Sequence, residues 1–189
     1  MKKTLILFLL LIFNDLSAHA FSSANGFLNG FTHPFLGLDH LFAMLAVGVW
    51  ASMLGKKQVY VLPISFPIIM SIGAILGMLN YEINNTEVFI SLSCLILGTL
   101  VLFSIKVSLI VSIFITGLFA IFHGYAHGIE MPSNNNPLVF TISFMFSTGI
   151  LHALGIFLAE LNLKKINIKR ISGIIITIAG LYYLFLTLI

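Results

Sequence analysis

The sequence has little charge and almost no cysteine. Of its 189 residues, 8% are Asp, Glu, Lys or Arg and 59% are hydrophobic, and the mean hydropathy is +1.12. This polar surface is too small to cover a water-soluble globule, so the composition predicts an integral membrane protein. The single cysteine, Cys94, cannot form an intrachain disulfide, and its apolar surroundings predict a packing role. The nine Lys and Arg residues form no basic face interleaved with aromatics, which argues against nucleic acid as a partner.

The first twenty residues have the pattern of a cleaved secretory signal peptide. Two lysines precede an apolar core of about nine residues, which is far shorter than the roughly 20 residues that span a bilayer. Small residues, Ala18 and Ala20, then flank a histidine. We expect cleavage after Ala20, with cleavage after Ala18 as the alternative.

The rest of the chain contains six apolar windows, each about as long as a helix that spans a bilayer. They cover residues 34–54, 59–79, 88–105, 107–128, 138–161 and 171–189. We therefore expect an all-α polytopic membrane protein, in which a signal peptide at 1–20 is followed by a single domain of six transmembrane helices at 21–189.

The connections between these windows alternate in charge. The first, third and fifth connections hold every Lys and Arg that follows the signal peptide, at positions 56, 57, 106, 164, 165, 169 and 170. The second and fourth connections hold Glu82, Glu87 and Glu130 and no basic residue. By the positive-inside rule the basic connections are cytoplasmic, so the mature N-terminus and the C-terminus are both expected outside. The signal peptide independently predicts an outside N-terminus.

Residue types that bind metals stand at the start of the first window. His33 is expected to cap the first helix at its outer end, with Pro34 in the first turn, where its missing N–H costs nothing. Asp39 and His40 come two turns below. His33 and His40 are seven residues apart, so they would share one helix face with about 10 Å between them along the axis. The Asp39 carboxylate can coordinate a cation itself or accept the spare N–H of a histidine.

A second group of such residues ends the fourth window. His123 and His127 are four residues apart and Glu130 is three further on, so all three lie on one stripe of a helix. Two imidazoles one turn apart can bind one divalent ion. At ~1.5 Å per residue, these side chains reach the outer level of the first helix, so we expect the two groups to meet. Gly124 and Gly128 would let another helix approach closely beside them.

A third position lies deeper in the fifth window. His152 falls roughly 20 Å from the outer start of its helix, and Glu160 stands near the cytoplasmic end. Together with the two outer groups, these residues form a ladder of polar groups at several depths, as an ion path requires. For three residues a structural role is the alternative: an interfacial cap for His33, a solvated loop position for Glu130, and a satisfied core histidine for His152.

Imidazole and carboxylate ligands without a thiolate favour borderline divalent ions: nickel, cobalt, zinc or copper(II). These residues also carry a resemblance to a known family. The segment "HPFLGLDHLFAMLAVGVWA" (33–51) resembles the first signature of the HupE/UreJ family of hydrogenase and urease accessory proteins, "FHGYAHGIEMP" (122–132) resembles its second, and "LHALG" (151–155) is similar to a further family histidine.

The resemblance covers essentially the whole chain. It implies a nickel or cobalt permease of the bacterial cytoplasmic (inner) membrane that supplies hydrogenase or urease, with Ni²⁺ or Co²⁺ as the transported ion and no prosthetic group. Cytoplasmic metallochaperones of hydrogenase or urease are the partners it suggests, besides the metal ion and the lipid bilayer. The implied metal ligands are His33, Asp39, His40, His123, His127, Glu130 and His152.

Two other functions remain open at this point. One is a zinc-dependent membrane hydrolase with Asp39 or Glu130 as general base on a metal-bound water. The other is a membrane-bound metal chaperone or scaffold for metalloenzyme assembly. An enzyme needs one closed site at one depth, whereas a conduit needs ligands at several depths, so the deeper His152 favours transport and a protein that is not an enzyme.

Overall fold

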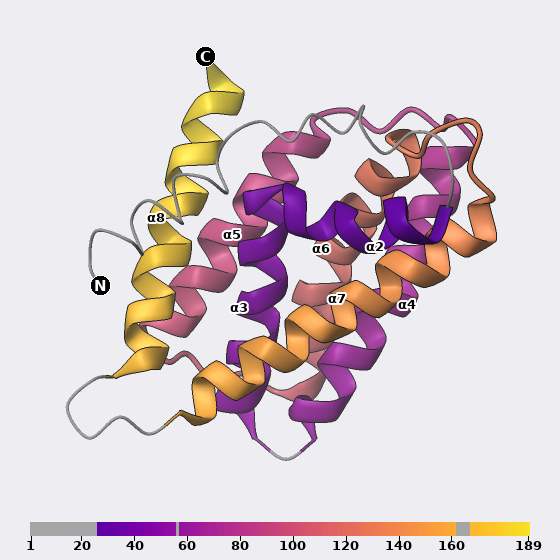
Figure 1. Ribbon diagram of the computed structural model, residues 1–189. Coiled ribbons are helices and arrows are strands. Elements are labelled where there is room, and N and C mark those ends of the chain that lie inside the picture. The colour runs from indigo at the N-terminus through magenta and orange to yellow at the C-terminus, as the bar shows by residue number, and fades with distance from the viewer. Residues whose placement is uncertain (1–25, 56, 162–166) are drawn as a thin grey trace, which may run out of the picture.

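The computed structural model describes residues 26–55, 57–161 and 167–189. The expected signal peptide at 1–20, both cleavage positions and three of the basic residues (56, 164 and 165) lie outside the described residues. Within the described part all the regular secondary structure is α-helix, which confirms the all-α prediction (Figure 1). The seven helices are α2 (Gly26–Leu36), α3 (Leu38–Leu54), α4 (Gln58–Met78), α5 (Thr86–Leu102), α6 (Leu109–Ile129), α7 (Pro137–Glu160) and α8 (Ile168–Leu188).

Four of these described helices, α4, α6, α7 and α8, are long and apolar enough to cross a membrane, and the bent pair α2 and α3 makes five if it is one span. Helix α5 is apolar but has only 17 residues. Large apolar side chains also face outward on α4, where Ile64, Ile68 and Ile72 recur at helical spacing and are all more than half exposed. A stripe of this kind suits contact with lipid. The chain is therefore a multi-pass helical membrane protein, and the count of six spans stays a prediction.

The first expected helix is two helices, which corrects the sequence interpretation. His33 and Pro34 lie inside α2, and the chain turns by 81° at Gly37 before α3 begins. His33 is therefore not a helix cap, and His33 and His40 do not share one straight helix face. The physical reason is a helix start at residue 38: Gly37 has extended backbone, and the Asp39 carboxylate accepts the backbone N–H of His40 (2.8 Å), one of the free donors of a first turn.

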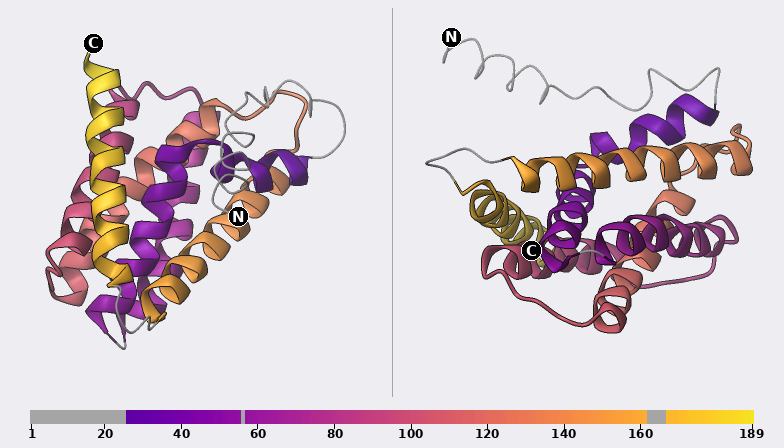
Figure 2. Two further views of the ribbon diagram at one scale, coloured as in Figure 1. Left: turned by 60° about the vertical axis from the view of Figure 1, so that its left-hand side comes forward. Right: turned by 90° about the horizontal axis from the view of Figure 1, so that it is seen from below.

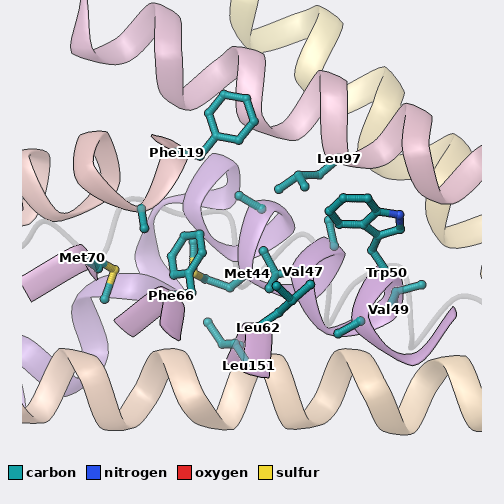
Figure 3. Packing of buried hydrophobic residues seen from close by; sticks show 14 of the residues in the cluster. Met44, Val47, Val49, Trp50, Leu62, Phe66, Met70, Leu97, Phe119 and Leu151 are labelled. Atoms are coloured by element: carbon teal, nitrogen blue, oxygen red, sulfur yellow. The ribbon is translucent and has the colours of Figure 1, made fainter. Parts of the chain in front are cut away.

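Helix α3 lies at the centre of the molecule. It packs against α7, α5, α4 and α8, and α2 lies across α7 (Figures 1 and 2). Five consecutive residues of α3, Val47–Ala51, are all buried, as expected for a helix that is apolar all round and enclosed by neighbours. Trp50 donates from its indole N–H to the carbonyl of Ile105 (2.9 Å), so it is a core residue with a satisfied polar atom (Figure 3).

Glycine lets α4 and α6 pack closely. A Cβ at Gly124 would collide with the backbone carbonyl of Met70, and one at Gly128 with that of Ala74. This confirms the expectation that these two glycines admit a neighbouring helix. The contact fixes the end of α6 that carries His123 and His127.

From α3 to α8, successive helices run in opposite directions, so the charged residues near their ends fall into two groups. The C-terminal ends of α3, α5 and α7 lie at one end of the molecule, which we call the basic end because Lys57, Lys106 and Lys169 follow these helices in the sequence (Figure 1). The connections after α4 and α6 lie at the other, the acidic end, with Glu82 and Glu130. This separation matches the alternation of charge in the sequence.

Candidate metal site

The two motif segments meet, as the sequence predicted. Four imidazoles from α2, α3 and α6 lie together near the acidic end, in the order His33, His127, His40 and His123. Their successive ring centroids are 4.7, 4.9 and 4.9 Å apart. With Asp39 and Glu130 these residues form what we call the histidine cluster.

Three members of the cluster lie close enough together that they could hold one metal ion. His33, His127 and Glu130 each offer a ligand atom, and these atoms all lie within 4.8 Å of one another. Nε2 of His33 donates to Oε2 of Glu130 at 2.7 Å, although the two residues are 97 positions apart. Burial raises the pKa of the Glu130 carboxyl, but the hydrogen bond and charge of His33 outweigh burial and hold that pKa below its ordinary value. The carboxylate is thus kept in the ionised form that binds a cation.

The break in the helix brings His33 to this group. The 81° bend lays α2 against α7, where Gly30 approaches the backbone of Phe140. A side chain at position 30 would collide with that backbone, so the small residue sets how closely α2 can lie. His33 then reaches over the end of α6 to Glu130. The seven positions from His33 to His40 therefore include the turn at Gly37, so the two side chains do not lie along one helix.

Asp39 forms a hydrogen bond with His40 and does not belong to the group of His33, His127 and Glu130. Nδ1 of His40 donates to Oδ1 of Asp39 at 3.0 Å, which is the second of the two arrangements considered from the sequence. The contact fixes the tautomer, so that Nε2 of His40 carries the lone pair. This Nε2 is buried and has no hydrogen-bond partner among the described residues.

His123 is also held through its Nδ1, but by a backbone carbonyl instead of a carboxylate. Its Nδ1–H donates to the carbonyl of Phe119, one turn earlier in α6, at 3.0 Å. Its Nε2 is buried and unpartnered within the described part of the chain. His127 stacks on Phe144 of α7, with ring centroids 5.0 Å apart. The aromatic ring thus forms one wall of the cluster.

His152 lies outside the cluster, deeper along α7. Its Nδ1–H donates to the carbonyl of Pro63 at 3.5 Å, and its Nε2 is buried without a partner among the described residues. The carbonyl is free because its helical partner would be the N–H of residue 67, which is also a proline. The ring of Phe66 contacts both His152 (5.2 Å between centroids) and His123 (5.9 Å).

Sequence reasoning missed Phe66, Phe144 and the proline pair. The two rings gave no sequence signal, because apolar residues are common throughout these helices. The proline pair did give one: prolines four apart in a helix leave one carbonyl unpaired, and a buried donor is expected to satisfy it. Cys94 is buried and free, and its thiol donates to the backbone carbonyl of Asp39 (2.9 Å), in agreement with a packing role.

Three imidazoles therefore share one design. In His40, His123 and His152, Nδ1 donates to a protein oxygen, and Nε2 is buried without a hydrogen-bond partner among the described residues. Buried polar atoms are normally hydrogen-bonded, so unpartnered ones need an explanation. A neutral imidazole held by its second nitrogen is the form in which histidine binds metal ions.

The comparisons with known proteins identify the family. The profile described as HupE / UreJ protein matches residues 7–183. The chain is 42% identical over 165 residues to Protein HupE of Rhizobium leguminosarum bv. viciae, an alignment that covers 86% of each chain. No solved structure matches. The protein whose helices bring these histidines together belongs to the HupE/UreJ family of hydrogenase and urease accessory proteins.

Proposed function

We propose that this protein is a secondary permease that imports a divalent transition metal ion, Ni²⁺ in the first place and Co²⁺ as the alternative. The ion would cross the bacterial cytoplasmic membrane for the maturation of hydrogenase or urease. The observation that carries the proposal is that Nε2 of His40, His123 and His152 is buried and has no partner in the described part of the chain, close to the group of His33, His127 and Glu130. Membership of the family supports nickel and cobalt over the other borderline ions.

The proposed path starts at the group of three. Glu130 and His33 are partly exposed, whereas His127 is buried, so an ion can reach this group from water and pass to nitrogen ligands inside. His127 is followed by His40 and then by His123 at ring spacings that permit transfer between neighbours. A conduit must hold its ion loosely enough to release it. Few ligands at each step, rather than a closed site of four, meet that requirement.

The proposed membrane arrangement has six spans, with α2 and α3 as one broken span and α5 as a short one. The basic end faces the cytoplasm and the acidic end faces outward, where the histidine cluster would capture the ion. Discontinuous helices at midplane sites are common in transporters, because their ends bring polar groups to the ion. The membrane potential can drive import, since it supplies ~2.3 kcal/mol per charge per 100 mV and twice that for a divalent ion.

Uptake of radioactive nickel into proteoliposomes that contain only this protein tests the proposal. We expect uptake by the wild type under an inside-negative potential and background uptake by His40→Ala and His127→Ala. Unchanged uptake in both variants would refute the permease.

The same preparation separates the other candidates. A chaperone or scaffold would bind nickel in equilibrium dialysis and move none into the vesicles. A zinc hydrolase would lose activity with a chelator and show no potential-dependent accumulation of metal.

A further inference from the structure

The aromatic rings of the metal path form one series with a single member that cannot bind metal. The series runs His33, His127, His40, His123, Phe66, His152, and its successive ring centroids are 4.7, 4.9, 4.9, 5.9 and 5.2 Å apart. Five members carry a nitrogen ligand. Phe66 carries none, and in this series of ring contacts it links His123 of the cluster to His152.

Both histidines that contact Phe66 have a nitrogen that could bind a metal ion. Nε2 of His123 and Nε2 of His152 are buried and lack partners among the described residues. On α7, the hydroxyl of Thr148 is also buried and unpartnered in the described part of the chain. Thr148 precedes His152 by four residues on α7, so the two share one helix face. We call Thr148 and His152 the deep pair.

Phe66 is held firmly in this position. It is fully buried among Met44, Met70 and Leu62 in the core (Figure 3). Its helix is anchored to His152 through the carbonyl of Pro63. The hydrogen bond between His152 and Pro63 ties the backbone of α4 to α7 beside Phe66, so a route past this point requires displacement of the ring itself.

We propose that Phe66 is a barrier between the histidine cluster and the deep pair, and that displacement of its ring controls passage from one to the other. This inference deepens the proposed function and rests on it. A divalent ion that leaves His123 finds no lone pair at Phe66, so it must pass the ring before the imidazole and hydroxyl of the deep pair can take it. The ring also keeps the two sets of ligands from becoming one closed site that would trap the ion.

Accessibility of position 152 tests the barrier without any metal. In a Cys94→Ala background, His152→Cys introduces a thiol behind Phe66, and a membrane-impermeant, positively charged methanethiosulfonate reagent is added to intact cells or, in parallel, to inverted vesicles. We expect slow modification from the side of the cluster. Adding Phe66→Ala should raise that rate roughly tenfold or more, the change given by a barrier lowered by about 1.4 kcal/mol.

Two further variants keep the test decisive. Phe66→Leu keeps most of the buried apolar volume and should give an intermediate rate, which serves if Phe66→Ala does not accumulate in the membrane. Phe119→Ala deletes the same side chain from α6 in the same core and should leave the rate unchanged. Rapid modification from the side of the cluster with Phe66 in place would overturn the barrier. Equal rates from that side with and without the ring would also overturn it. The readout does not depend on nickel, so a failed permease would show in the uptake assay and not here.

Discussion

The histidine cluster and the deep pair offer different numbers of candidate metal ligands. The cluster gathers four imidazoles and two carboxylates from α2, α3 and α6, and its outer members are partly exposed. The deep pair has one imidazole and one hydroxyl, both buried. A site rich in charged ligands and open to water suits capture, whereas a dry site with few neutral ligands suits passage. In the proposed function, capture and transfer of the metal ion therefore belong to separate residues, and each step can be tested separately.

The largest expected effect comes from removing single histidines. Nickel binding and nickel uptake, measured side by side, distinguish the cluster from the deep pair. His127→Ala removes a ligand shared by the group of three and the ring series, so nickel binding and uptake should both fall to background. His152→Ala should leave binding at the cluster unchanged and lower the uptake rate by roughly tenfold or more, as a barrier raised by about 1.4 kcal/mol would. Equilibrium dialysis and proteoliposome uptake measure the two quantities. Loss of binding in His152→Ala would show that the regions are one site.

The support of His40 by Asp39 should have the next largest effect. Asp39→Asn keeps the size of the side chain but removes its charge, so the tautomer of His40 is no longer fixed by a carboxylate. Partners of this kind are worth about 10- to 100-fold in metal affinity. Nickel titration of the purified protein should show that loss. An affinity equal to that of the wild type would mean that Asp39 only starts the helix.

The contact between His33 and Glu130 should matter less. Both side chains are partly exposed, and such pairs contribute about 0.2–1 kcal/mol. Glu130→Gln is therefore expected to weaken nickel binding by roughly fivefold or less, because the pair contributes little to holding the two side chains in place. Glu82→Gln, on the other connection at the acidic end, is the matched control and should bind nickel as the wild type does. A loss as large as that of His127→Ala would make Glu130 a principal ligand.

The packing of α4 against α6 beside His123 should affect the stability of the protein, and it has the smallest expected effect on nickel binding. Gly124→Ala would force α4 and α6 apart beside His123, and overpacking of this kind costs about 1–3 kcal/mol. Gly149→Ala on α7 is the control, because a Cβ there meets open space and should stabilise by about 0.4–1 kcal/mol. Thermal unfolding in detergent measures both changes. Equal stabilities would show that the close approach at Gly124 is not required.

The sequence predicted the helices better than their breaks. Apolar windows of about 20 residues located α4, α6, α7 and α8 closely, since a bilayer allows few alternatives to a helix of that length. The first window, 34–54, was expected to be one helix that starts at Pro34, because proline is common in the first turn of a helix. In the structure Pro34 lies inside α2, and the start of α3 is marked by Gly37 and by Asp39 in its first turn. Both signals are present in the sequence, and only the backbone at Gly37 decides between them.

For the candidate site, the sequence by itself determined the types of side chain that could bind a metal ion and the end of the molecule where they gather. Helical spacing placed His123, His127 and Glu130 on one stripe, and the alternating charges placed that stripe at the acidic end. Tertiary structure alone decided which ligands are neighbours: that His33 pairs with Glu130, that His40 reaches both α6 histidines, and that Phe66 precedes His152. The physical reason is that spacing along a chain fixes a residue's position on its own helix. Which helices pack together, and at what angle, depends on glycines, on the bend at Gly37 and on the shapes of side chains far apart in the sequence.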